Sequence, residues 1–288
     1  MGWTLSAFAD EAGKGVADQI AALKRAGIQH IDLRTVDNHN ISELPLDLAQ
    51  RVRHELEAAH IRVNMLGSPI GKIDITDDLE VDLCKLSHLS ELADVFGCRA
   101  VRIFSYYNKT RIDRQTWRDE ALARLHRLAD LARDLGLVLY LENEKEIFGD
   151  RCEPMLTIAE RLHDPQTFRI LFDFDNFAQC GEDVWDNWSR LKDRTDGFHL
   201  KDSTPDHMHV PVGEGVGQVR QILAEANALG WNGPLSLEPH VAHSSAVMAT
   251  GASGREDQAL KDLSPADSFQ VAAEVAKKLL NEIGAAHE

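Results

Sequence analysis

One unit recurs along this chain: a helical stretch, a short link that usually bears glycine, and a brief apolar strand. Clear copies are AALKRAGIQHIDLR, ELADVFGCRAVRIF, LARDLGLVLYLE and EANALGWNGPLSLE, and EAAHIRVNML is a copy without glycine. Glycine suits the left-handed backbone position that ends a helix. Strands that alternate with single helices pair in parallel, because each helix carries the chain back to the starting edge of the sheet. The repeat therefore predicts an α/β fold with a parallel sheet.

Eight segments have the pattern expected for strands of this sheet. They lie near residues 5–8, 31–34, 63–66, 101–104, 137–142, 170–173, 197–201 and 235–238. Eight strand and helix units in 288 residues match a (β/α)8 barrel. An open, doubly wound sheet is the rival, but no GxGxxG phosphate turn follows the first strand. We therefore predict a single-domain TIM barrel over residues 1–288.

A long segment outside the repeat follows the last strand. Residues 239–262 include HVAHSSAVMATGASGRED, which has neither helical nor strand periodicity. Loops of this length are uncommon without a function, and in a barrel this one would lie over the rim where the strands end. We expect a lid over a bound substrate.

The composition excludes several classes of protein. With 31 basic and 47 acidic residues, the net charge of −16 argues against a nucleic-acid partner, which requires a basic face. No apolar stretch approaches a membrane span and the first residues do not resemble a signal peptide, so we expect a cytoplasmic protein without a membrane partner. The four cysteines form no CxxC pair, so we expect neither a disulfide framework nor a thiolate zinc site.

Acidic or imidazole side chains stand at the ends of four successive strand segments. They are Glu142 in LVLYLENE, Asp173 in RILFDFDNF, His199 in GFHLKDS and Glu238 in PLSLEPH. One such carboxylate alone more often forms a turn or caps a helix. In a closed barrel, however, all four side chains meet above one rim. The three carboxylates then repel one another unless a cation lies between them. The set predicts a divalent-metal site, with Mn²⁺ expected first and Mg²⁺, Co²⁺ or Zn²⁺ as alternatives.

Short motifs in order along nearly the whole chain resemble those of the xylose-isomerase-like TIM-barrel superfamily, which contains sugar phosphate isomerases and epimerases. The motifs are FADE, IDLR, SPIGK, RIFS, LENEKEIFGD, FDFDNF, FHLKD, VGEG and LSLEPH. In that superfamily the metal ligands are a Glu, an Asp, a His and a Glu at the ends of strands five to eight. The resemblance implies the same ligand roles for the four strand-end residues here.

The chemistry that follows is proton transfer at carbon. A divalent ion that chelates a ketone oxygen and the neighbouring hydroxyl acidifies the proton on the carbon and stabilises the resulting enediolate. One carboxylate removes that proton, and a second returns a proton to the same carbon or to the adjacent one. The resemblance to related epimerases assigns this acid–base role to Glu142 and Glu238. We therefore expect an isomerase or epimerase of a keto or aldo sugar, or of a derivative.

Six further residues are substrate-binding candidates: Lys72, Arg102, Glu144, Asn176, Lys201 and His240. Glu144 is an alternative base if the strand continues past Glu142, or else a solvated loop carboxylate. Lys72 follows a tight turn and either meets a phosphate or carboxylate or is a surface lysine. Lys201 either holds an oxyanion or pairs with Asp202 at the rim.

Two positions depart from the pattern of the ketose epimerases. Asn176 stands where they typically carry His, and Pro205 stands where they tend to carry Arg. Asn can bond a hydroxyl but cannot shuttle a proton, so we expect a different grip on the substrate. The loop histidines His207, His209, His240 and His243 are expected in solvent, with His240 the best candidate for the site.

Other functions stay open. A dehydratase or lyase, acting on an inosose or another keto sugar, could use the same enediolate to expel a hydroxyl. Apurinic endonucleases also resemble this superfamily, but their trinuclear zinc centre requires extra histidines where this chain has Arg34 and Leu66. A non-catalytic sugar-binding protein would have no need of an intact ligand set. A homo-oligomer is compatible with the barrel, although no exposed apolar stripe indicates one.

Overall fold

A computed structural model describes residues 2–241, 260 and 262–288 of the chain. Eight parallel strands close into a barrel in which each strand pairs with the next one along the chain. The strands are β1 (Thr4–Ala7), β2 (His30–Leu33), β5 (Arg62–Leu66), β6 (Ala100–Ile103), β7 (Val138–Glu142), β8 (Phe168–Asp173), β9 (Thr195–Leu200) and β12 (Pro234–Leu237). All eight coincide with expected segments, so the predicted (β/α)8 barrel is confirmed. The lid expected over residues 239–262 falls largely outside the described residues.

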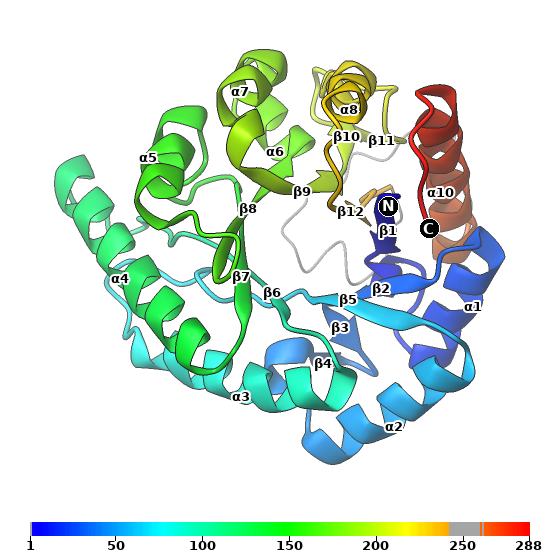
Figure 1. Ribbon diagram of the computed structural model, residues 1–288, viewed down its shortest axis with the longest axis horizontal. Coiled ribbons are helices and arrows are strands. Elements are labelled where there is room, and N and C mark those ends of the chain that lie inside the picture. The colour runs from blue at the N-terminus through cyan, green and yellow to red at the C-terminus, as the bar shows by residue number, and fades with distance from the viewer. Residues whose placement is uncertain (1, 242–259, 261) are drawn as a thin grey trace.

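Helices surround the barrel as an outer ring (Figure 1). They are α1 (Val16–Ala26), α2 (Leu46–Ala58), α3 (Glu80–Phe96), α4 (Arg114–Asp134), α5 (Cys152–Leu162), α6 (Phe174–Gln179), α7 (Val184–Leu191), α8 (Val219–Ala228) and α10 (Pro265–Glu282), with three short 3₁₀ helices η1 (Ala9–Glu11), η2 (Ile41–Glu43) and η3 (Lys192–Arg194). Gly27 and Gly97 end α1 and α3 with φ of 65°, the left-handed conformation expected of these links. No helix of the described residues is long and apolar enough to span a membrane.

Two short hairpins on the side of the barrel where the strands have their C-terminal ends were not expected. β3 (Thr35–Val36) pairs with β4 (His39–Asn40), and β10 (Asp202–Ser203) pairs with β11 (His209–Val210). Strands of two residues have no periodicity that a sequence pattern could reveal. Both hairpins follow directly on barrel strands, so they build up the rim on which the candidate site lies.

The VGEG motif forms a loop around a single carboxylate. Asp202 accepts hydrogen bonds from the backbone N–H groups of Gly213, Gly215 and Gly217, at 2.9 to 3.0 Å. A Cβ at Gly215 would overlap both the Asp202 carboxylate and the Ser203 carbonyl, so this position requires glycine. The loop thereby fixes the chain that leaves β9.

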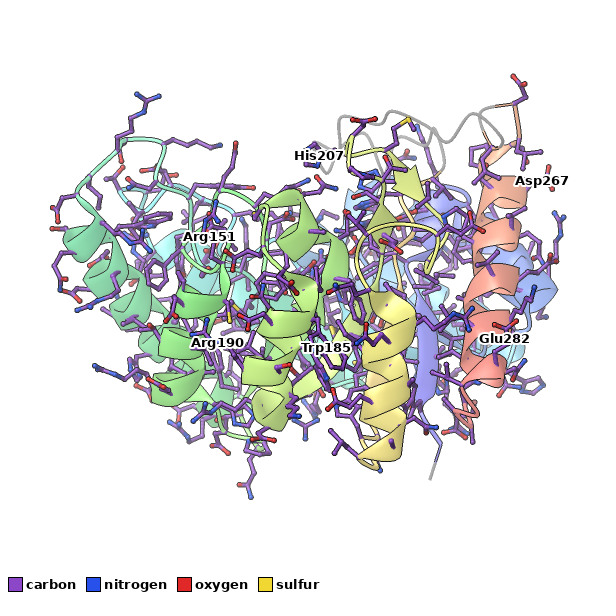
Figure 2. All side chains as sticks on the ribbon, turned by 90° about the horizontal axis from the view of Figure 1, so that it is seen from above. Arg151, Trp185, Arg190, His207, Asp267 and Glu282 are labelled. Carbon is purple, nitrogen blue, oxygen red and sulfur yellow. The ribbon has the colours of Figure 1, made fainter. Side chains whose placement is uncertain are left out.

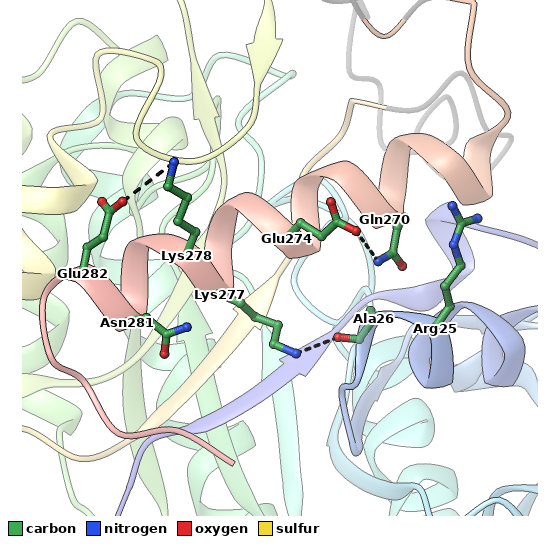
Figure 3. A pocket seen from close by; sticks show the side chains of 8 residues that line it. All are labelled: Arg25, Ala26, Gln270, Glu274, Lys277, Lys278, Asn281 and Glu282. Atoms are coloured by element: carbon green, nitrogen blue, oxygen red, sulfur yellow. Dashed lines mark hydrogen bonds and ion pairs between the residues drawn. The ribbon is translucent and has the colours of Figure 1, made fainter.

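The first and last described segments of the chain lie side by side next to β1 (Figure 1). The Trp3 N–H donates to the Ala286 carbonyl at 2.7 Å, and α10 lies beside α1 (Figure 1). Figure 3 shows the groove between these two helices, where Lys277 Nζ donates to the Ala26 carbonyl at 2.9 Å. The described residues that line the groove all belong to α1 and α10, so the groove lies between two outer helices and is separate from the barrel rim.

Candidate metal centre

The structure brings the four strand-end residues together at the rim. Glu142 and Asp173 are the last residues of β7 and β8, His199 lies one residue before the end of β9, and Glu238 follows β12 directly. These strands are consecutive neighbours in the barrel. All four side chains are buried, and one ligand atom from each lies within 4.8 Å of the others.

The imidazole of His199 lies close to all three carboxylates. Its Nδ1 lies 3.1 Å from Oε1 of Glu142, 3.2 Å from Oε2 of Glu238 and 3.9 Å from Oδ2 of Asp173. Neighbouring ligands of one tetrahedral metal ion are about 3.4 Å apart when each bond is about 2.1 Å long. The separations thus suit ligands that share one ion.

The hydrogen bonding of these side chains is incomplete. Within the described residues, both nitrogens of His199 and one oxygen of each carboxylate are buried without a partner of good hydrogen-bond geometry; these oxygens are Glu142 Oε2, Asp173 Oδ2 and Glu238 Oε2. Asp173 Oδ2 has an ion-pair contact with Lys201 Nζ at 3.0 Å. Buried polar atoms are nearly always paired, because burying them unpaired costs about 1–3 kcal/mol each. The donor set, three carboxylates and one imidazole, fits a divalent metal ion.

Asp173 is also the N-cap of α6. Its Oδ1 accepts the N–H of Asn176 at 2.7 Å, while Oδ2 faces the cluster. The ordinary expectation for a strand-end carboxylate, a helix cap, therefore holds for Oδ1. Oδ2 takes no part in the cap and can serve as a ligand.

Burial and the charges of neighbouring side chains shift the pKa values of the cluster residues. Burial raises the pKa of Asp173 to about 8. Burial opposes protonation of His199, but the charges and hydrogen-bonding oxygens of Glu142 and Glu238 together outweigh it and raise the pKa of His199 to about 10. Burial would likewise raise the pKa of Glu142, yet the charges of His199 and Arg102 hold this pKa below its usual value. The cluster thus attracts positive charge, which a proton or a divalent ion can supply.

Two arginines contact the outer oxygens of the glutamates. Arg34 Nη1 lies 2.6 Å from Oε1 of Glu238, and Arg102 Nη1 lies 3.3 Å from Oε2 of Glu142 and 3.7 Å from Oε1 of Glu238. Both guanidinium carbons lie 4.9 Å from the ring centre of Phe8, which suits a cation–π contact. Arg102 therefore contacts the glutamates directly, whereas it was expected to contact substrate.

Residues of the FADE and IDLR motifs complete this side of the site, and sequence reasoning missed their roles. Asp10 binds Arg34 through both oxygens at 2.9 Å. Glu11 lies 3.5 Å from Arg34 and accepts the backbone N–H of His240 at 2.9 Å. The FADE and IDLR motifs were the only sign in the sequence that these residues matter. The spacing of residues along the chain could not show that Arg34 pairs with Glu238.

The remaining candidates lie around the mouth of the barrel. Lys201 Nζ lies 3.0 Å from Asp173 Oδ2 and 3.1 Å from Asn176 Oδ1, so the alternative of a pair with Asp202 is wrong. β7 ends at Glu142, so Glu144 is not the continuation of the strand; instead it pairs with Lys72 at 2.9 Å. Burial would raise the pKa of Glu144, but Lys72 and Lys201 lower it to about 2.

The loop histidines differ in burial. His207 is exposed on the loop between β10 and β11, at the upper rim in Figure 2. His209 and His240 are buried, contrary to the expectation of solvated side chains, and their rings meet at 5.2 Å. Burial lowers the pKa of His240 to about 3, so this imidazole is neutral at physiological pH. His243 lies outside the described residues.

Several proteins of known structure share the fold of this chain. Solved structures with the same fold include D-psicose 3-epimerase in the presence of D-fructose, with a TM-score of 0.74, 14% identity and coverage of 99% of this chain and 100% of that chain. Another is the probable 3-DHS dehydratase AsbF, involved in petrobactin synthesis, from Bacillus anthracis, with a TM-score of 0.71, 18% identity and coverage of 96% and 99%. A third is a xylose isomerase-like TIM barrel protein from Mycobacterium smegmatis in complex with magnesium, with a TM-score of 0.69, 16% identity and coverage of 97% and 98%.

These identities are low, so the structural likeness by itself shows the fold. No curated protein matches the sequence. A family model described as the xylose isomerase-like TIM barrel, by contrast, matches residues 20–264, which is most of the chain. The chain belongs to the xylose isomerase-like TIM barrel family.

Proposed function

We propose that this protein is a divalent-metal-dependent isomerase or epimerase of a keto or aldo sugar, or of a close derivative. The observation that carries the proposal is the convergence of four buried ligand atoms within 4.8 Å at the rim of the barrel. The epimerases among proteins of the same fold support the reaction class. The proposed partner is a small sugar, and a cytoplasmic location and a homo-oligomer are part of the same expectation.

The ion would be held by Glu142, Asp173, His199 and Glu238. When bound, it would polarise the carbonyl oxygen of a sugar and the hydroxyl oxygen on the neighbouring carbon, and so acidify the proton on the carbon that bears this hydroxyl. We expect Mn²⁺ first, because three oxygen donors and one nitrogen donor suit it, with Mg²⁺, Co²⁺ or Zn²⁺ as alternatives.

Glu142 and Glu238 are the proposed acid and base. β7 and β12 are separated by β8 and β9 around the barrel, so the two carboxylates approach the mouth from different directions. One glutamate takes the proton from the carbon of the substrate, and the other delivers a proton. Delivery to the same carbon from the opposite face gives an epimer, whereas delivery to the neighbouring carbon gives the isomer.

The polar groups around the mouth would bind the hydroxyl groups of the sugar. Lys72 and Glu144 offer an ion pair at the edge, and Arg102 lies beside both glutamates. Asn176 and Lys201 lie next to the ligand Asp173. His240, buried and neutral, lies 3.5 Å from Glu238. Ketose epimerases typically carry a proton-shuttling His at the position of Asn176. Asn176 can bond a hydroxyl group of the sugar but cannot shuttle a proton.

Elimination of water is the second candidate. The buried ammonium of Lys201 lies 3.0 Å from Asp173, beside the proposed ion, and has no assigned part in the proton transfer between Glu142 and Glu238. A donor at this point could protonate a departing hydroxyl group and so convert the same enediolate into a dehydrated product.

Solvent deuterium exchange tests the proposal. The metal-free protein, reconstituted with Mn²⁺, is incubated in D₂O with a panel of ketoses and aldoses, and label at each carbon is read by NMR. Label at the carbon next to the carbonyl, lost on chelation, is the expected result. Product masses lower by one water would indicate elimination. A protein that binds Mn²⁺ yet exchanges no proton in any sugar would contradict the proposal.

A further inference from the structure

A second group of ligand atoms lies on the far side of Glu238. Atoms of Glu11, Glu238 and His240 lie within 4.8 Å of one another, and all three residues are buried. His240 Nε2 lies 3.5 Å from Oε1 of Glu11 and 3.5 Å from Oε1 of Glu238, and among the described residues it has no hydrogen-bond partner. These separations are too long for hydrogen bonds but match neighbouring ligands of one metal ion.

Glu238 could bridge two ions at this point. Its Oε2 lies 3.2 Å from His199, on the side of the first cluster, whereas its Oε1 faces His240. A carboxylate that presents one oxygen to each of two clusters is the arrangement of two-metal sites, in which the ions lie about 3.5–4 Å apart.

The guanidinium of Arg34 already lies at the second cluster. Arg34 Nη1 is 2.6 Å from Oε1 of Glu238, and Nη2 is 3.5 Å from Oε1 of Glu11. Asp10 binds the same guanidinium through two bonds of 2.9 Å and fixes its plane. The two carboxylate oxygens that a second ion would need are therefore directed at Arg34.

The charges of the rim agree with a single ion. The buried ionisable groups in this ion-pair network, other than histidine, are Asp10, Glu11, Glu142, Asp173, Glu238, Arg34, Arg102 and Lys201. Burial raises the pKa of Glu11 and of Asp173 to about 8 in the metal-free protein, and a bound divalent ion favours their ionised forms. In that ionised state, five carboxylates and three cations leave a formal charge of −2, which one divalent ion neutralises. Without the arginine charge at position 34 the balance is −3, and one divalent ion no longer suffices.

We propose that the guanidinium of Arg34 takes the place of a second divalent ion at Glu11, Glu238 and His240 and so keeps the metal centre mononuclear. The inference rests on the proposed function, because it assumes an ion at Glu142, Asp173, His199 and Glu238. It goes beyond that function because it assigns the number of ions to one side chain, Arg34, which directly follows β2 and is not among the proposed ligands.

The test is the number of Mn²⁺ ions bound per chain, measured on the full-length protein by equilibrium dialysis with elemental analysis. We expect one ion in the wild type and in Arg34→Lys, which keeps the charge. We expect two ions in Arg34→Met and in Arg34→Gln, with the EPR signature of coupled Mn²⁺ pairs. Glutamine is the second neutral variant because its amide can still bond Asp10. Arg51→Met, which removes an arginine paired at the surface with Glu55, should bind one ion.

Further variants locate the second ion. Adding His240→Ala to either neutral variant should return the count to one, because it removes the only nitrogen ligand of the second cluster. Two ions in the wild type, one ion in both neutral variants, or two ions that persist without His240 would each overturn the inference and leave the proposed function standing. A wild-type protein that binds no Mn²⁺ would instead overturn the proposed function and, with it, the inference.

Discussion

The carboxylate of Asp173 serves two structures at once: Oδ1 accepts the N–H of Asn176 at 2.7 Å, and Oδ2 lies 3.9 Å from Nδ1 of His199. The first contact caps α6, and the second contributes to the candidate metal centre. The two roles use different oxygens, so different substitutions should separate them.

Asp173→Asn should weaken metal binding and spare the fold. Asparagine caps a helix about as well as aspartate. Burial already raises the pKa of Asp173 to about 8, so in the metal-free protein at pH 7 the side chain is mostly protonated and resembles the amide. We expect the Kd for Mn²⁺, measured by calorimetry, to rise at least about 100-fold, since loss of a ligand should cost more than the 10–100-fold loss typical of an outer partner. The free energy of unfolding in chelator should change by less than about 1 kcal/mol.

The matched variants distinguish the cap from the ligand. Asp173→Ala should lose both functions, with a further loss of about 1 kcal/mol in unfolding free energy. Asp113 caps α4 through Thr116, is exposed and is not part of the candidate metal centre, so Asp113→Ala should cost about the same stability and leave the Mn²⁺ affinity unchanged. Wild-type Mn²⁺ affinity in Asp173→Asn would remove Asp173 from the ligand set.

Binding of Mn²⁺ should strengthen as the pH rises from about 6 to 9. In the metal-free protein the surrounding carboxylates raise the pKa of His199 to about 10, and burial raises the pKa of Asp173 to about 8. Both groups hold a proton below these values, and a metal ion must displace that proton to bind. Calorimetry in buffers of different ionisation enthalpy should detect about one to two protons released per ion at pH 7. An affinity independent of pH over this range would mean that neither group is a ligand.

The barrel and the four strand-end residues could be predicted because each depends on local signals. The glycine after a helix recurs in four units and an apolar run marks each expected strand, and parallel strands in a barrel present their ends at one rim. Residues as distant as Glu142 and Glu238 were brought together by topology alone, with no need to know any side-chain orientation.

The arginine contacts could not be predicted in the same way. Arg34 binds Asp10, 24 residues away, and Glu238, 204 residues away, and its direction depends on packing against Phe8. A long side chain with several rotatable bonds at a rim can reach many partners, so spacing does not select one. The burial of His209 was hidden for a related reason, because its hairpin consists of two-residue strands.

The glycine loop around Asp202 should be intolerant of a single methyl group. Gly215→Ala would drive Cβ into the Asp202 carboxylate and the Ser203 carbonyl, neither of which can move without losing the loop. We expect the unfolding free energy, measured by urea denaturation, to fall by about 1–3 kcal/mol. Gly230→Ala is the control: its φ of 74° carries a strain of about 1 kcal/mol, but no atom lies within 4 Å of the added carbon. An equal effect of both variants would show that crowding at Gly215 is unimportant.

Glu142→Gln and Glu238→Gln should each lower kcat for the exchanging sugar by about 100- to 10,000-fold, because an amide can neither accept nor return the proton on carbon. The unfolding transition of both variants should remain cooperative and near that of the wild type, since the amide has the same shape. Glu144→Gln is the matched comparison. Glu144 pairs with Lys72 at the edge of the mouth, so this variant should raise KM and change kcat less than tenfold. Steady-state rates with Mn²⁺ at saturation check all three. Near-normal kcat in Glu142→Gln together with a collapse of kcat in Glu144→Gln would transfer the role of base to Glu144.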